Sequence, residues 1–233
     1  MIRGRALIVT LGGRRILDHV DLTVARGEAV ALIGQNGAGK TSVLRCVLGL
    51  VRYRGDVTIA GLDPKCDPIG ARSLIGYMPQ APAFLEDSAR GSLALIARLR
   101  GIRAPGIDAL LERVGLAEHA RRSVRTFSTG MKQRLSLAAA LIGDPPVLVL
   151  DEPTASLDLG GQRELVALLG RLHGEGRTLL LSSHRAGEVR ALCDRVVVLD
   201  QGRVIDEGAV DAVAARIWPD EVADTTSKLR VLR

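Results

Sequence analysis

Residues 34–41 read Gly-Gln-Asn-Gly-Ala-Gly-Lys-Thr, and this stretch decides the fold of the chain. It matches G-x-x-x-x-G-K-[ST], a loop whose backbone N–H groups and following helix N-terminus cradle an anionic phosphate. Residues 29–33 before it form an apolar run that predicts a buried strand, and residues 42–50 after it carry apolar side chains at helical spacing. Because strand, loop and helix follow in the order that the motif requires, we predict a nucleotide site and not merely a glycine-rich turn.

The residue types in this loop predict how it binds a nucleotide. The side chain of Lys40 is expected to reach the β- and γ-phosphates, and the hydroxyl of Thr41 is expected to bind Mg²⁺. The glycines allow the backbone to approach the phosphates closely. We therefore predict ATP and Mg²⁺ as cofactors, and the nucleotide-binding residues of the loop are Gly34, Asn36, Gly37, Gly39, Lys40, Thr41 and Ser42.

The composition is that of a folded protein of 233 residues, with 47% hydrophobic and 25% charged residues. No apolar run approaches the ~18 residues that a transmembrane helix needs, and the N-terminus does not lead into a signal-peptide core. We therefore expect the chain in the cytoplasm unless a partner holds it elsewhere. The net charge of +6 is scattered and only 2% of residues are aromatic, which disfavours a base-stacking platform for single-stranded nucleic acid.

The order of predicted elements favours an α/β fold. Strands are predicted at 6–9 and 20–24, and the second alternates like a half-exposed antiparallel strand. From residue 147 onward, apolar runs alternate with helical patterns, which is typical of a parallel sheet covered by helices. Residues 81–127 show only helical periodicity. We predict a phosphate-loop NTPase core with a mostly parallel sheet, an N-terminal antiparallel β subdomain and an inserted α-helical subdomain. The predicted boundaries are 1–80 and 143–210 for the core, 81–142 for the helical subdomain and 211–233 for a C-terminal tail.

Two carboxylates, Asp151 and Glu152, end the predicted strand at 147–150. Ligands of open α/β sheets bind at the carboxyl ends of the strands. Asp151 is suited to hold Mg²⁺ through water, and Glu152 is placed to polarise a water that attacks the γ-phosphate. Without the phosphate loop, an Asp-Glu pair at the end of a strand would most simply be solvated and have no catalytic role. Together with the phosphate loop it predicts the catalytic carboxylates.

Over about residues 6–208 the chain resembles the ATP-binding subunit of an ATP-binding-cassette (ABC) transporter. Four further motifs occur in the order of that family. Gln80 matches the Q-loop glutamine, and Ser128-Thr129-Gly130-Met131-Lys132-Gln133 matches the signature motif. Ser156-Leu157-Asp158 matches the D-loop, and His184 matches the switch histidine.

This resemblance implies a role for each matched residue. Two subunits of the family pack head to tail, so that each ATP lies between one phosphate loop and the partner's signature helix. Ser128 and the N–H of Gly130 would then contact the γ-phosphate, and Asp158 would carry the state of one site to the other. His184 would hold the attacking water together with Glu152. The implied catalytic residues are Glu152, His184 and Gln80, and the implied metal-binding residues are Thr41, Gln80 and Asp151.

The same resemblance implies an ATPase that dimerises on ATP, most simply as a homodimer, and drives a separate integral membrane permease. It would sit peripherally on the cytoplasmic face of the inner (plasma) membrane, with no nucleic-acid partner. The signature variant Ser-x-Gly-Met-x-Gln-Arg resembles exporters of the ABC-2 type, which serve drugs, polysaccharides and sodium. Within that set, residues 90–93 and 107–116 resemble the ATPase that matures the copper site of nitrous-oxide reductase.

Two other functions remain as alternatives. A soluble ABC ATPase acting on nucleic acid or ribosomes usually carries long coiled-coil or zinc insertions, or two cassettes, and this chain has room for neither. A nucleotide-binding regulator without turnover is disfavoured because Glu152, His184 and Gln80 are all present.

One departure from the family concerns the adenine base. The family usually stacks a tyrosine on adenine, but no Tyr, Phe, Trp or His lies between Ile2 and Asp18. Leu11 falls closest to that position, and Arg14 or Arg15 could stack on the base in its place. We therefore expect weak ATP affinity and poor discrimination between ATP and GTP.

Overall fold

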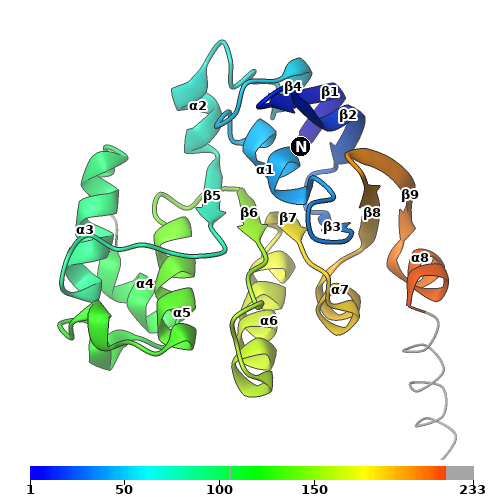
Figure 1. The fold of residues 1–233 in the computed structure, drawn as a ribbon. Helices are drawn as coiled ribbons and strands as arrows, with labels where there is room; N and C mark the ends of the chain where they lie inside the picture. The colour runs from blue at the N-terminus through cyan, green and yellow to red at the C-terminus, as the bar shows by residue number, and fades with distance from the viewer. Residues whose placement is uncertain (105, 219–233) are drawn as a thin grey trace, which may run out of the picture.

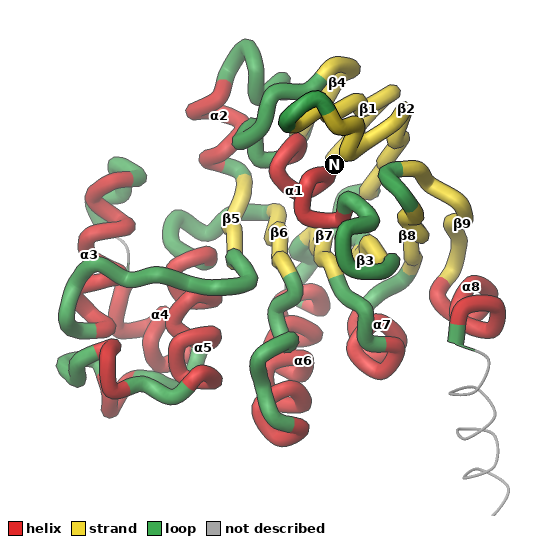
Figure 2. The backbone as a smooth tube through the Cα atoms, in the orientation of Figure 1, coloured by secondary structure: helices red, strands yellow, loops and turns green. Residues whose placement is uncertain are grey.

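The computed structural model describes residues 1–104 and 106–218, and its strands form two sheets (Figures 1 and 2). The smaller sheet is antiparallel with the order β2-β1-β4, formed by β1 (Ile2–Leu11), β2 (Arg14–Val24) and β4 (Arg54–Ile59). Both β1 and β2 extend beyond the stretches predicted at 6–9 and 20–24. Ala6 and His19 have positive φ angles of 46° and 55°, and the pairing register shifts along β1. These irregularities break the alternation from which strand length is read.

The larger sheet has six strands in the order β5-β6-β7-β3-β8-β9. Its first five strands are parallel and β9 pairs antiparallel with β8 at the edge. The strands are β3 (Ala29–Ile33), β5 (Ile75–Met78), β6 (Val147–Asp151), β7 (Thr178–Ser182), β8 (Arg195–Asp200) and β9 (Arg203–Ala209). Strands β3, β6 and β7 are buried along their whole length, which explains their continuous apolar runs. Strands β3 and β6 both pair in parallel with β7. The phosphate loop and the two carboxylates, which follow the C-terminal ends of β3 and β6, therefore lie at the same end of the sheet, which we call the catalytic edge.

Helices cover the larger sheet and bury two apolar cores (Figure 1). Helix α1 (Lys40–Val47) packs between the two sheets, while α6 (Leu159–Gly174) and α7 (Ala186–Leu192) lie on the opposite face of the larger sheet. The short helix α2 (Pro68–Ser73) precedes β5. Helix α8 (Val210–Ile217) buries Val213 and packs against α7 and β9. The tail predicted from 211 thus begins inside a packed helix, and its residues 219–233 lie outside the described part of the chain.

The predicted helical insertion lies to one side of the larger sheet, next to β5 (Figures 1 and 2). It contains α3 (Ala89–Leu99), α4 (Ile107–Arg113) and α5 (Thr129–Ala140), with short 3₁₀ turns at Ala117–His119 and Val124–Thr126. Helix α5 packs against β5 and so joins the insertion to the sheet. The predicted α/β fold class is confirmed. Within residues 1–104 and 106–218, no helix has the length and apolarity that crossing a membrane requires.

Candidate nucleotide site

The phosphate loop leaves the end of β3 and enters α1 at Lys40. Gly34 and Gly39 have φ angles of 152° and 108°, and neither position has room for a side chain. A Cβ on Gly34 would lie 2.2 Å from the carbonyl oxygen of Leu199, and one on Gly39 would lie 2.7 Å from Cδ2 of Leu17. Asn36 and Gly37 are exposed at the tip of the loop. The predicted backbone cradle is therefore present, and its glycines are required by close approach as well as by dihedral angle.

Lys40 carries a buried positive charge at the mouth of this cradle. Its ammonium donates to the carbonyl oxygens of Gly34 at 2.7 Å and Gln35 at 3.3 Å, and it lies 3.5 Å from Oε1 of Glu152. Only 7% of the side chain is exposed. A buried cation needs anionic partners, and within residues 1–104 and 106–218 only the Glu152 carboxylate pairs with Lys40. The phosphates of a nucleotide would add to it.

Thr41 and Asp151 bring hard oxygen ligands together beside the loop. The Thr41 hydroxyl donates to Oδ1 of Asp151 at 3.1 Å, and the Ser182 hydroxyl donates to the same oxygen at 2.7 Å. Ser42 follows Thr41 in the half-buried first turn of α1. Mg²⁺ prefers one or two carboxylates with waters and substrate phosphates, and the convergence of this hydroxyl and this buried carboxylate fits that donor set.

Glu152 has a backbone conformation that residues with side chains rarely adopt. Its φ is 47°, and its N–H donates to both the hydroxyl (2.9 Å) and the carbonyl oxygen (3.2 Å) of Ser182. Such conformations cost free energy and concentrate at functional sites. The result is a carboxylate that points toward Lys40 on one side and toward His184 on the other. Nδ1 of His184 lies 2.8 Å from Oε2 of Glu152.

The remaining predicted contacts lie in a different place, which we call the signature cleft. This cleft of about 590 Å³ is lined by Ser128, Gly130 and Asp158 with their neighbours, and no residue of the phosphate loop is among its described lining residues. The Ser128 hydroxyl accepts a hydrogen bond from the N–H of Met131 at 3.2 Å and so caps α5. Asp158 caps α6 in the same way. The structure therefore divides the predicted site into two separate groups.

Comparison with known proteins agrees with this arrangement of motifs. Residues 17–155 match the family model described as ABC transporter. The chain belongs to the ABC transporter family. It is an ATP-binding ATPase subunit of that family, and the alternative of a nucleic-acid ATPase is not favoured.

Three relatives from the ABC transporter family illustrate the likeness. A daunorubicin resistance ATP-binding protein of Streptomyces coeruleorubidus is 40% identical, over 91% of this chain and 69% of the relative. A lantibiotic transport ATP-binding protein of Streptococcus pyogenes is 34% identical, over 91% of this chain and 92% of the relative. A bacterial ABC transporter cassette solved as a dimer is 26% identical with a TM-score of 0.80, over 90% of this chain and 99% of that one.

Gln80, the Q-loop residue of the ABC motif set, is exposed beyond the end of β5. Met78 pairs with Leu150 in the sheet, so Gln80 lies at the same edge as Asp151. Its carbonyl oxygen accepts a hydrogen bond from Nε2 of Gln133 on α5 at 3.2 Å. Within the described chain its side chain makes no hydrogen bond to the other site residues, so the structure places Gln80 near the site without joining it.

Ser182 contacts two of the candidate site residues of this ABC cassette, and the sequence analysis did not identify it. It is fully buried, and its hydroxyl bridges Asp151 and the N–H of Glu152. The sequence signal for this residue is a serine at the end of the otherwise apolar run at residues 179–182. The contact between Ser182 and Asp151 follows from the pairing of β7 with β6, in which Asp151 lies opposite Ser182, and this pairing cannot be read from the serine alone.

Proposed function

We propose that two copies of this chain pack head to tail on ATP and drive export through a separate membrane permease. The observation that carries the proposal is the separation of the two groups of site residues. Lys40, Glu152 and His184 meet at the sheet edge, whereas Ser128 and Asp158 line the signature cleft elsewhere. Each chain thus holds one half of two different sites. The dimeric cassette and the resistance and transport names of the relatives support this assembly and the direction of transport.

Each residue at the catalytic edge would have a distinct role in ATP hydrolysis. The ammonium of Lys40 would neutralise charge on the β- and γ-phosphates, and the carboxylate of Glu152 would accept a proton from the attacking water. His184 would orient that carboxylate through the contact of 2.8 Å. Thr41 and Asp151 would hold Mg²⁺, which when bound neutralises charge on the phosphate oxygens. The two groups in the signature cleft, the Ser128 hydroxyl and the Gly130 N–H, would complete the partner's site.

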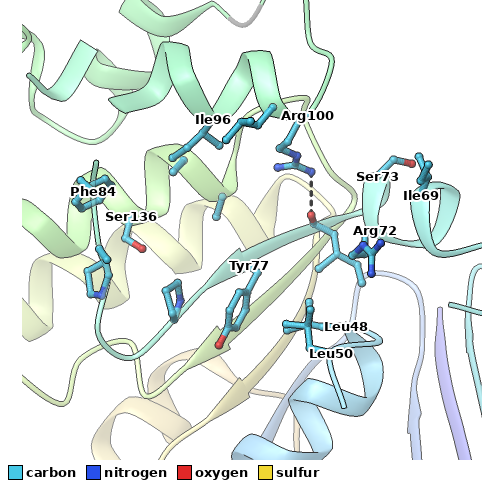
Figure 3. A pocket seen from close by; sticks show the side chains of 17 residues that line it. Leu48, Leu50, Ile69, Arg72, Ser73, Tyr77, Phe84, Ile96, Arg100 and Ser136 are labelled. Atoms are coloured by element: carbon cyan, nitrogen blue, oxygen red, sulfur yellow. Dashed lines mark hydrogen bonds between the residues drawn. The ribbon is translucent and has the colours of Figure 1, made fainter. Parts of the chain in front are cut away.

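The permease would dock in an apolar groove of about 610 Å³ that runs between the helical insertion and the sheet (Figure 3). Figure 3 shows Ile96 and Arg100 on one side of this groove, and Leu48 and Leu50 on the other. Gln80 and the apolar residues of the insertion are the docking surface that the sequence favours, and the core lines this groove together with the insertion. The large apolar side chains that line it and are exposed are Leu50, Ile69 and Leu99.

An amphipathic helix from a cytoplasmic loop of the permease fits this groove, because an apolar groove takes the apolar face of a helix. Residues 79 and 82–84, which lie on either side of Gln80 in the sequence, also line the groove. An occupant would therefore press on the segment that leads from the nucleotide site into the helical insertion. Arg100, whose guanidinium donates to the carbonyl oxygen of Ile75 at 3.0 Å, fixes that side of the groove to β5.

Sedimentation of the full chain tests the assembly. Glu152→Gln should bind ATP without hydrolysing it and should sediment as a dimer with ATP and Mg²⁺. Adding Ser128→Glu should restore the monomer, because a carboxylate in the signature cleft repels the γ-phosphate. Ala212→Glu, exposed on α8, adds the same charge outside the cleft and should leave the dimer intact. A dimer that survives Ser128→Glu would contradict the head-to-tail arrangement.

A second experiment tests the groove. Leu99→Asp should weaken co-purification with the permease and uncouple transport while basal ATPase activity stays unchanged. Ile205→Asp is the matched control, because it alters another exposed apolar residue far along the sheet on β9. Equal losses from both substitutions would argue against the groove. Maturation of a copper site stays a prediction from the helical insertion alone.

A further inference from the structure

Glu188 is a buried carboxylate for which the mechanism above has no use. It lies on α7, one turn beyond His184, and only 7% of it is exposed. Burial raises the pKa of Glu188 above its ordinary value, and the hydrogen bond from Ser183 opposes that shift. Burying a carboxylate is costly, and an apolar residue would usually pack there at no such cost. Its presence therefore calls for a function in the site.

A chain of hydrogen bonds runs from Glu188 through the Ser183 hydroxyl to both neighbours of His184. The Ser183 hydroxyl donates to Oε2 of Glu188 at 2.5 Å, and the N–H of Arg185 donates to the Ser183 hydroxyl at 3.1 Å. The N–H of Ser183 is itself held by the carbonyl oxygen of Leu32 at the end of β3. Glu188 therefore holds residue 183 directly and residue 185 through the Ser183 hydroxyl, and together these bonds fix the backbone on both sides of His184.

Glu188 also faces the segment that carries Glu152. Thr154, two residues after Glu152, is buried, and its hydroxyl favours the charged form of Glu188. Thr154 Oγ1 and Glu188 Oε1 have no full hydrogen bond within the described chain, so this contact is looser than the one to Ser183. The negative charge of Glu152 acts on Glu188 as well. One buried carboxylate thus lies between the chain segments that present the two partners of the 2.8 Å contact.

We propose that Glu188 is a positioning residue for ATP hydrolysis, which holds the loop at 182–185 so that Nδ1 of His184 stays against the carboxylate of Glu152. This inference rests on the roles proposed above for Glu152 and His184. Glu188 acts through Ser183 and touches neither the nucleotide nor the attacking water. It therefore affects the rate of hydrolysis and not the binding of ATP, which depends on the phosphate loop.

Steady-state hydrolysis by the full chain gives the first expectation. Glu188→Ala should lower kcat by about tenfold or more, because small displacements of a positioned group are costly. The KM for ATP should change by less than about twofold, since the phosphate loop is untouched. Glu188→Gln keeps an oxygen that accepts the Ser183 hydroxyl and should recover kcat to within about threefold of wild type. Ser183→Ala removes the bridging hydroxyl and should lower kcat by a similar factor. It provides the test if Glu188→Ala does not fold.

A double-mutant cycle separates positioning from general damage to the fold. In a His184→Ala background, Glu188→Ala should lower kcat by no more than about twofold further, because the group that it positions is gone. Leu192→Ala removes buried side-chain volume from the same helix and should have equal effects in both backgrounds. A full tenfold loss from Glu188→Ala in the His184→Ala background would overturn the role of Glu188. Wild-type hydrolysis in His184→Ala or Glu152→Gln would overturn the roles proposed for those residues and this inference together.

Nuclear magnetic resonance of the histidine rings gives the same test without turnover. The chain has 4 histidines, so the signal of His184 is assigned by its loss in His184→Ala. Glu152→Gln should move that signal in the wild-type background. In the Glu188→Ala background, the change in the chemical shift of His184 caused by Glu152→Gln should be less than half as large, because the imidazole ring no longer contacts the side chain of residue 152. An equal movement in both backgrounds would overturn the inference.

Discussion

Replacing Ser182 with alanine should weaken the fold and slow hydrolysis together. The hydroxyl of Ser182 donates to Oδ1 of Asp151 at 2.7 Å and accepts from the N–H of Glu152 at 2.9 Å, and the residue is fully buried. Alanine removes both bonds with almost no change in volume. It leaves the Asp151 carboxylate with one donor fewer, and it withdraws support from the left-handed backbone of Glu152.

The expected cost follows from these two bonds. A hydrogen bond to a charged group contributes about 1.5–3 kcal/mol, and one between neutral groups contributes about 0.5–1.5 kcal/mol. The N–H of Glu152 retains the weaker bond to the Ser182 carbonyl oxygen at 3.2 Å, which lowers its share. The total is about 2–4 kcal/mol, which in a chain of this length corresponds to a fall in Tm of about 4–16 °C.

Thermal unfolding of the full chain, with phosphate release on the same samples, measures both effects. Ser92→Ala is the matched control, because Ser92 is equally small and buried but makes a single bond of 3.3 Å to the carbonyl oxygen of Glu86. We expect Ser92→Ala to cost less than Ser182→Ala and to leave hydrolysis unchanged. Equal shifts in Tm with normal phosphate release from both variants would refute the bridging role of Ser182.

Three further outcomes are expected. Lys40→Ala should abolish tight binding and hydrolysis of ATP in a nucleotide titration, because the charge that compensates the phosphates is lost. Leu11→Tyr should tighten ATP binding several-fold at an unchanged maximal rate, since Leu11 is 46% exposed at the end of β1 and an aromatic ring adds a stacking surface. A maleimide at neutral pH should label Cys66, which is exposed, before Cys46 and Cys193, because burial raises the pKa of Cys46 to about 12 and also raises that of Cys193. Mass spectrometry of the labelled chain would detect any other order.

The parts of the fold that the sequence predicted are those encoded locally. The phosphate loop, the strand ending at Asp151 and the position of His184 after β7 each follow from a short run of residues in its flanking pattern. Helical periodicity was also sufficient to predict α3, α4 and α5 as an insertion. These elements agree with the structure because their signals do not depend on which other segment they contact.

Features that depend on pairing between distant segments could not be predicted. The bridge made by Ser182 exists only because β6 and β7 pair in one register. The groove joins Leu48 and Ile69 of the core to Ile96 of the insertion, and no pattern in the sequence relates these positions. Pairing between distant segments is decided by the tertiary fold and not by local propensity.

The choice between Arg14 and Arg15 for stacking on the adenine base also depended on strand pairing that the sequence does not reveal. The sequence left Arg14 and Arg15 equal, but the hairpin places Arg14 directly across from Leu11. Arg15 instead donates to Oδ1 of Asp18 at 2.8 Å. Arg14 is therefore the better candidate to cover the adenine base, and an Arg14→Ala variant of the full chain would weaken ATP binding more than Arg15→Ala.

The central claim is that Glu152 is the base that activates water beside the phosphate loop. Phosphate release and ATP binding by Glu152→Gln test it directly. The amide keeps the shape of the side chain but cannot accept the proton, so hydrolysis should fall by about 10²–10⁴-fold while ATP still binds. Retention of a tenth or more of wild-type hydrolysis, with normal ATP binding, would contradict the claim and place the base elsewhere.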